Sequence, residues 1–159
     1  VRLEIINARM NCVLPACIMK QGTSIRFSVS TNFSGYLTLL DLNSKNQITQ
    51  LFPNQHSKNR NPEGAIIENR QLTIPDQYYG FEFEASPPLG EGQVLALVTK
   101  NKVDLSDILP VSRSLSVMPE IASLSLIEKI TERLRKIWPN DEQNRQAMWQ
   151  ATVVKYRIE

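Results

Sequence analysis

The 159-residue sequence is poor in the residues that carry most enzyme chemistry, because it contains one histidine and two cysteines. A zinc site needs about four ligands, so His56 together with Cys12 and Cys17 predicts no metal site. Glycine-rich phosphate loops and the Gly-x-Ser-x-Gly nucleophile turn are also missing. The sequence therefore predicts no cofactor, no metal and no catalytic residues, and we expect a domain that is not an enzyme.

The sequence also has no large excess of charge of one sign and no long apolar run. Eighteen basic and 16 acidic residues leave a formal net charge of +2, which is too balanced to predict nucleic-acid binding. A membrane-spanning helix needs about 20 apolar residues, and no run in the sequence approaches this length. With 42% hydrophobic and 21% charged residues, the composition is that of a folded domain and argues against intrinsic disorder.

The first hundred residues follow a pattern of short strands separated by turn residues. Residues 1–6 and 24–30 alternate apolar and polar side chains, as half-buried strands do. Residues 35–43 and 93–99 are apolar on both faces, which is typical of central strands covered on both sides. Further strands are expected at 47–53, 71–74 and 79–85. No helical pattern lies between these strands, which favours an all-β sandwich.

The last third of the chain has a different pattern. Ser125 and Glu128 have the spacing of a capping box, and Pro139 is expected to end the helix that follows. Residues 146–159 alternate again and predict a closing strand. The apolar positions of the predicted helix recur at helical spacing and are Ile127, Ile130, Leu134 and Ile137.

These patterns predict a mainly β fold, an immunoglobulin-like β-sandwich with a C-terminal amphipathic helix and a closing strand. We expect a single domain over residues 1–159, with a core at 1–103 and a helix-containing extension at 104–159. The chain starts at Val1 without an initiator methionine, which indicates that it is processed or excised from a longer chain.

A polar loop over residues 54–64 supplies the candidate binding residues. Its side chains offer amide donors and acceptors as well as positive charge. Loops held by a rigid sandwich are where binding usually occurs. The predicted binding residues are Asn54, His56, Lys58, Arg60 and Asn61.

The two cysteines leave three interpretations. Cys12 and Cys17 flank Pro15 closely enough for a local disulfide in an oxidising compartment. They could instead be ordinary thiols packed in the core, which is what we expect. The third interpretation is a hydrolase in which one cysteine pairs with His56 as a catalytic dyad.

Several short motifs carry a family resemblance between Gly22 and Thr99. They are Gly22-Thr23-Ser24-Ile25-Arg26-Phe27-Ser28-Val29, Gly35-Tyr36-Leu37, Leu51-Phe52-Pro53-Asn54, Ile74-Pro75 and Pro87-Pro88-Leu89-Gly90. The sequence resembles a bacterial family of uncharacterised accessory β-domains. Such domains occur C-terminal to caspase-like peptidases of the metacaspase or orthocaspase type, and in some kinase-linked and cell-envelope proteins.

The resemblance implies a non-catalytic binding or regulatory module whose partner is a protein or an adjacent peptidase domain. The caspase histidine and cysteine motifs are missing from this sequence, so no catalytic residue is carried over. An exported carbohydrate- or peptide-binding domain of the cell envelope remains the alternative. The expected location is the bacterial cytoplasm, or the envelope or periplasm if Cys12 and Cys17 form a disulfide.

Overall fold

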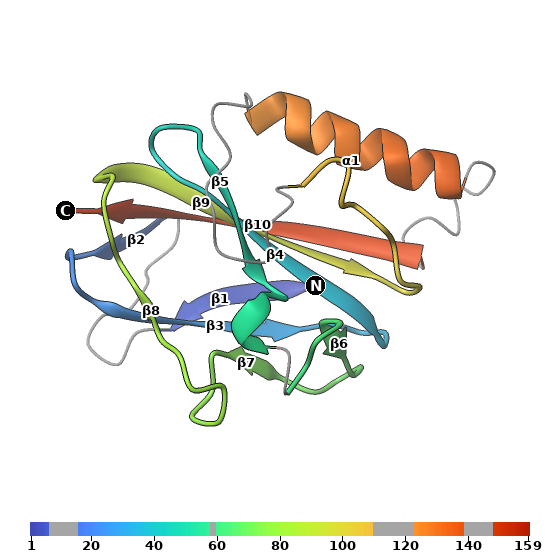
Figure 1. Cartoon of the computed structure of the whole chain (residues 1–159), viewed down its shortest axis with the longest axis horizontal. Helices are drawn as coiled ribbons and strands as arrows, with labels where there is room; N and C mark the ends of the chain where they lie inside the picture. Colours follow the sequence, from blue (N-terminus) through green and yellow to red (C-terminus); the bar gives the residue numbers. More distant parts are fainter. Residues whose placement is uncertain (7–15, 58–59, 110–122, 139–147) are drawn as a thin grey trace.

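The computed structural model describes residues 1–6, 16–57, 60–109, 123–138 and 148–159. Within these residues the chain forms two β-sheets and one α-helix, α1 (Ser123–Ile137), which lies outside the sheets (Figure 1). The prediction of a mainly β fold with a C-terminal helix and a closing strand is confirmed. No helix in the described part of the chain is both long and apolar enough to span a membrane.

The smaller sheet is antiparallel and has β3 at its centre. β3 (Ser24–Ser30) lies between β1 (Arg2–Ile6) and β7 (Leu72–Ile74), and it also pairs with the short β8 (Phe83–Glu84). β1 and β3 alternate exposed and buried residues, as the sequence predicts for strands with one solvated face.

The larger sheet contains strands from both ends of the chain. Its order is β2 (Ala16–Met19), β10 (Trp149–Ile158), β9 (Gly90–Thr99), β4 (Gly35–Leu42) and β5 (Ile48–Phe52), with β6 (Ala65–Ile66) also paired to β4. The pairing of β10 with β2 is parallel, and the other pairs are antiparallel.

The main core lies between the two sheets, which makes the fold a β-sandwich. Its buried side chains come from strands of both sheets and form one continuous cluster. Representative members are Leu3, Phe27 and Ile74 of the smaller sheet, and Leu37, Leu39, Val94, Ala96 and Ile158 of the larger sheet.

A second apolar cluster covers the outer face of the larger sheet. Leu40 and Leu97 point away from the sandwich core and pack with Ile130 and Leu134 of α1. The helix therefore explains why β4 and β9 are apolar on both faces, as the sequence predicts. The molecule has three layers, namely the smaller sheet, the larger sheet and the helix (Figure 1).

The closing strand β10 is an interior strand of the larger sheet, between β2 and β9. It pairs with β9 at ten positions from Trp149 to Ile158, and its other edge pairs with β2. Tyr156 and Ile158 bury their side chains in the main core. The last residues of the chain therefore complete the same sheet that residues 16–99 begin.

The structure corrects two local predictions and adds two short strands. The strand expected at 79–85 is reduced to β8, because Tyr79 and Phe81 pack edge-on in a row of aromatic rings instead of entering a ladder. The short strands β2 and β6 lack an alternating pattern long enough to predict. Helix α1 begins at Ser123, so Ser125 lies inside it and is not its N-cap.

Candidate functional site

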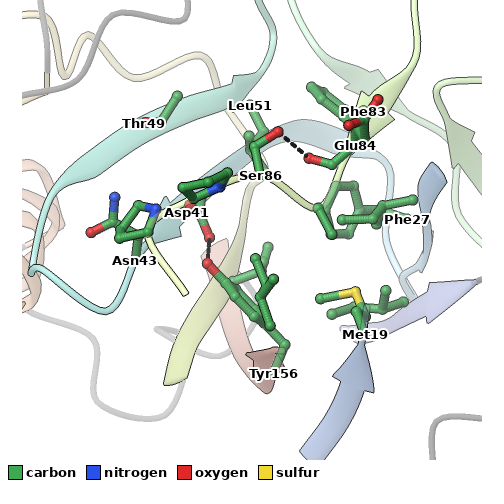
Figure 2. Close-up of a pocket in the computed structure, with 17 residues that line it drawn as sticks. Met19, Phe27, Asp41, Asn43, Thr49, Leu51, Phe83, Glu84, Ser86 and Tyr156 are labelled. Carbon is green, nitrogen blue, oxygen red and sulfur yellow. Dashed lines mark hydrogen bonds between the residues drawn. The ribbon is translucent and has the colours of Figure 1, made fainter. Parts of the chain in front are cut away.

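A cavity of about 180 Å³ lies between the two sheets (Figure 2). Its walls are mostly apolar, and its polar groups are few. The described apolar residues that line it are Ile5, Met19, Ile25, Phe27, Leu51, Phe83, Ala85, Pro87, Pro88, Val94 and Ile158. The described polar residues are Asp41, Asn43, Thr49, Glu84, Ser86 and Tyr156. An apolar pocket with a few convergent polar groups is the usual form of a ligand site.

The segment between β8 and β9 borders the cavity on its solvent side, where Glu84, Ser86 and Pro87 are exposed. Several hydrogen bonds hold this segment in place, including the exchange of backbone bonds that joins Ala85 to Gly22 and Thr23. The Ser86 hydroxyl donates to the Glu84 carbonyl oxygen at 3.2 Å, and the Ser44 hydroxyl donates to the Leu89 carbonyl oxygen at 2.7 Å. The border of the cavity is therefore tied to the β4–β5 turn.

Asp41 is the central polar group of the cavity. It follows Leu37 and Leu39 at alternate positions of β4, so the strand directs all three side chains toward the sandwich. The Tyr156 hydroxyl of β10 donates a hydrogen bond to Asp41 Oδ1 at 2.8 Å (Figure 2). A carboxyl group thus lies among apolar side chains with one tyrosine as its partner.

The environment of this pair changes the acidity of both groups. Burial raises the pKa of Asp41 to about 6, and the hydrogen bond from Tyr156 opposes the rise because it favours the ionised carboxylate. Burial and the nearby Asp41 carboxylate raise the pKa of the Tyr156 hydroxyl above its ordinary value. Tyr156 therefore acts as a hydrogen-bond donor at neutral pH, while Asp41 changes its charge around pH 6.

Gly92 makes room for the tyrosine ring. Gly92 faces Tyr156 across the β9–β10 ladder, and a Cβ atom at this position would lie 2.3 Å from Tyr156 Cζ. A side chain at position 92 would overlap the ring. The absence of a side chain here lets Tyr156 cross β9 and reach Asp41.

The predicted binding loop is held together by its own polar side chains. Asn54 is only 1% exposed. Its Oδ1 accepts hydrogen bonds from the backbone N–H groups of His56 and Ser57, and its Nδ2 donates to the Leu51 carbonyl oxygen. The Asn54 amide therefore stabilises the 3₁₀ turn η1 (Gln55–Ser57) and is not presented to solvent.

The other predicted binding residues lie around this turn. Asn61 bonds through both ends of its amide to the backbone of Ala65. The guanidinium of Arg60 lies 4.8 Å from the ring centroid of Tyr78, and the ring of His56 lies 5.7 Å from that of Phe81. Lys58 lies outside the described residues. The structure brings His56 and Arg60 next to aromatic rings, and a binding role for the loop stays a prediction.

Replacing Asn54 with alanine is expected to lower the free energy of unfolding by about 1–3 kcal/mol, because buried backbone groups lose their partners. Chemical denaturation of the variant measures this loss. Gln55→Ala is the matched control, since Gln55 is exposed on the same turn. Equal stability of the two variants would contradict a structural role for Asn54.

The structure overturns the expectation of two free thiols. Cys17 lies in β2, is 3% exposed in the main core and is disulfide-bonded. The only other cysteine of the sequence, Cys12, lies outside the described residues. The close spacing of the two cysteines allows such a bridge, but the sequence carries no direct signal of the redox state.

One feature of the sequence could have indicated the cavity, although the strand and helix patterns do not predict it. Asp41 is a charged residue at an inward position of a strand that is otherwise apolar on that face. Its partner Tyr156 lies 115 residues further along the chain, and only the pairing of β10 with β9 and of β9 with β4 brings the two together. Within the described ranges, no group of three histidine, cysteine, aspartate or glutamate side chains could hold a metal ion.

Comparison with protein families matches residues 18–102 to a domain of unknown function, DUF4384. The match covers more than half of the chain, so the protein belongs to this family. The matched segment contains β3, β4, β5 and β9. It therefore includes Asp41 of the cavity, whereas Tyr156 lies beyond the matched segment. Comparison with curated proteins and with solved structures gives no match.

Proposed function

We propose that this chain is a non-catalytic binding domain and that the cavity between the two sheets is its ligand site. One observation carries the proposal. An apolar cavity between the two sheets contains a half-buried carboxyl group with a single hydrogen-bond donor, the Tyr156 hydroxyl, among the residues that the structure describes. Burial of a carboxyl group with few partners is costly for folding, and it is commonly retained where it serves binding.

The size of the cavity limits what it can bind. Sites for drug-sized molecules have volumes of roughly 300–1,000 Å³. A volume of about 180 Å³ instead fits a small molecule or a single side chain of a partner. The domain would therefore recognise one compact group, and other surfaces would contribute the rest of any protein interface.

The proposal can be tested with three four-carbon probes of similar shape, n-butanol, n-butylammonium and n-butyrate. Saturable shifts of amide resonances from cavity residues in NMR titrations are expected for at least one probe. Thr49→Trp should abolish them, because Thr49 lines the cavity and an indole ring there would fill it. Gln93→Trp is the control, since Gln93 shares the outer face of β9 with Leu95. No saturable shift with any probe would remove the cavity as a ligand site.

We also propose that the domain works beside a caspase-like peptidase or a related bacterial signalling protein. The support is the resemblance carried by Gly35-Tyr36-Leu37 and Leu51-Phe52-Pro53-Asn54, both of which lie within the matched family segment. The test is to read the gene upstream of Val1. A peptidase domain with its own histidine and cysteine motifs is expected there, and its absence would contradict this assignment.

A second candidate is an exported carbohydrate- or peptide-binding domain of the cell envelope. The disulfide at Cys17 favours it, because disulfides persist in oxidising compartments such as the periplasm. In this case a signal peptide would directly precede Val1 in the gene. The cysteines of the native protein would then resist alkylation until a reductant is added. In a cytoplasmic protein both thiols would be alkylated without reductant.

A further inference from the structure

We infer that the cavity selects a primary ammonium group carried on an unbranched apolar stem. This inference rests on the proposed function of the cavity and names the chemistry of its ligand. Such a group occurs on the side chain of lysine and on simple alkylamines. The reasons are the charge of the cavity, the separation of its polar and apolar walls, and its volume.

Among the residues that the structure describes, the cavity is lined by acidic side chains and by no basic one. Asp41 and Glu84 are the only charged side chains among the described lining residues. Two basic residues lie on neighbouring strands, Arg26 of β3 and Arg157 of β10, and both are exposed. Because the residues next to them in sequence face the core, these two side chains lie on the opposite face of their strands. Glu84 is exposed and alternates with the inward Phe83, so the carboxylate that a cationic ligand would meet inside the cavity is that of Asp41, whereas an anion would be repelled.

The hydrogen-bonding capacity of Asp41 also favours a donor. An ionised carboxylate has about four acceptor positions, and the Tyr156 hydroxyl occupies one of them. An ammonium group supplies three donors and forms a charge-assisted hydrogen bond that is stronger than a neutral one. Thr49 lies at the same cavity and can accept a further hydrogen bond through its hydroxyl oxygen, whereas Asn43 Oδ1 already accepts the N–H groups of Lys45 and Gln47.

The remaining walls suit an apolar stem. Phe27 and Phe83 pack edge to face at 5.7 Å between centroids, and both line the cavity together with Met19 (Figure 2). A methylene chain gains free energy by leaving water for such a surface. The ligand therefore has the form of a lysine side chain, with a charged head at Asp41 and an apolar stem along the aromatic wall.

The test compares the three four-carbon probes on the intact protein. At pH 7.5, n-butylammonium is expected to bind more tightly than n-butanol, and n-butyrate more weakly than both. Asp41→Asn should weaken n-butylammonium binding by about tenfold or more, because a hydrogen bond to a charged group is lost, and leave n-butanol binding within about twofold. Glu91→Gln is the control, since it removes a negative charge from the same sheet at an 84% exposed side chain.

A second measurement reads Asp41 directly. The chemical shift of its carboxyl carbon should report a pKa near 6 in the free protein, and saturating n-butylammonium should lower this pKa. The affinity for n-butylammonium should fall about tenfold from pH 7.5 to pH 5, because only about a tenth of the Asp41 side chains are ionised at pH 5. An unchanged Asp41 pKa at saturation would overturn the inference.

The outcomes separate this inference from the proposed function. Binding of n-butanol as tight as that of n-butylammonium, with no effect of Asp41→Asn, would leave the cavity as a ligand site and overturn its selectivity for cations. Failure of all three probes would overturn both. A Gly-Gly-Lys-Gly-Gly peptide distinguishes the two sources of the ammonium group. Tighter binding of the peptide than of n-butylammonium identifies a lysine of a partner protein, and tighter binding of n-butylammonium identifies a small amine.

Discussion

Leu134→Ala is expected to lower the free energy of unfolding by about 2–5 kcal/mol, as large-to-small substitutions in packed cores do. Leu134 is 1% exposed and joins α1 to Leu40 and Leu97 on the outer face of the larger sheet. Its truncation would leave a hole between the helix and the sheet. Chemical denaturation followed by circular dichroism and by tryptophan fluorescence measures the change.

Ile137→Ala is the matched control, because Ile137 lies on the same helix with 42% of its surface exposed. We expect it to cost much less than Leu134→Ala. A single unfolding transition that shifts as a whole in Leu134→Ala would show that the helix and the sandwich unfold together. A small effect equal to that of Ile137→Ala would contradict the packing of α1 on the sheet.

The second large effect is a dependence of stability on pH that originates at Asp41. Its pKa is about 6 in the folded protein and 3.8 in the unfolded chain, so the folded state holds the proton more tightly. The stabilising contribution of the protonated carboxyl is complete below pH 3.8 and is lost as the pH rises through 6. Over this range Asp41 should lower the free energy of unfolding by about 3 kcal/mol.

Asp41→Asn isolates this contribution, because the amide oxygen can still accept the hydrogen bond from Tyr156 but cannot ionise. The difference in unfolding free energy between the variant and the wild type should grow in favour of the variant from pH 4 to pH 7. Tyr156→Phe removes the donor that favours the ionised carboxylate, so the pKa of Asp41 should rise further. A difference that is constant with pH would contradict the raised pKa.

Local patterns in the sequence account for most of the strands. The alternation in residues 24–30 and the two-sided apolar character of residues 93–99 predicted β3 and β9, because strand side chains alternate between faces and neighbouring layers bury each face. The apolar spacing through Ile130 and Leu134 likewise predicted α1. These features depend on residues close together in the chain, so they can be read from the sequence.

The candidate site depended on contacts that no local pattern contains. Asp41 and Tyr156 meet because β10 pairs with β9 inside the larger sheet, and Gly92 leaves the space through which the ring reaches the carboxyl group. The sequence predicts a binding role for Asn54 from its polar amide, and the structure shows that this amide forms hydrogen bonds with the backbone of its own turn.

The sequence by itself determined that the protein has a mainly β fold with an amphipathic C-terminal helix, because periodicity reports which face of each element is buried. Only the tertiary structure decided where polar groups are enclosed. The pairing of distant strands sets the burial of Asp41, and burial together with the hydrogen bond from Tyr156 sets the acidity of the carboxyl group.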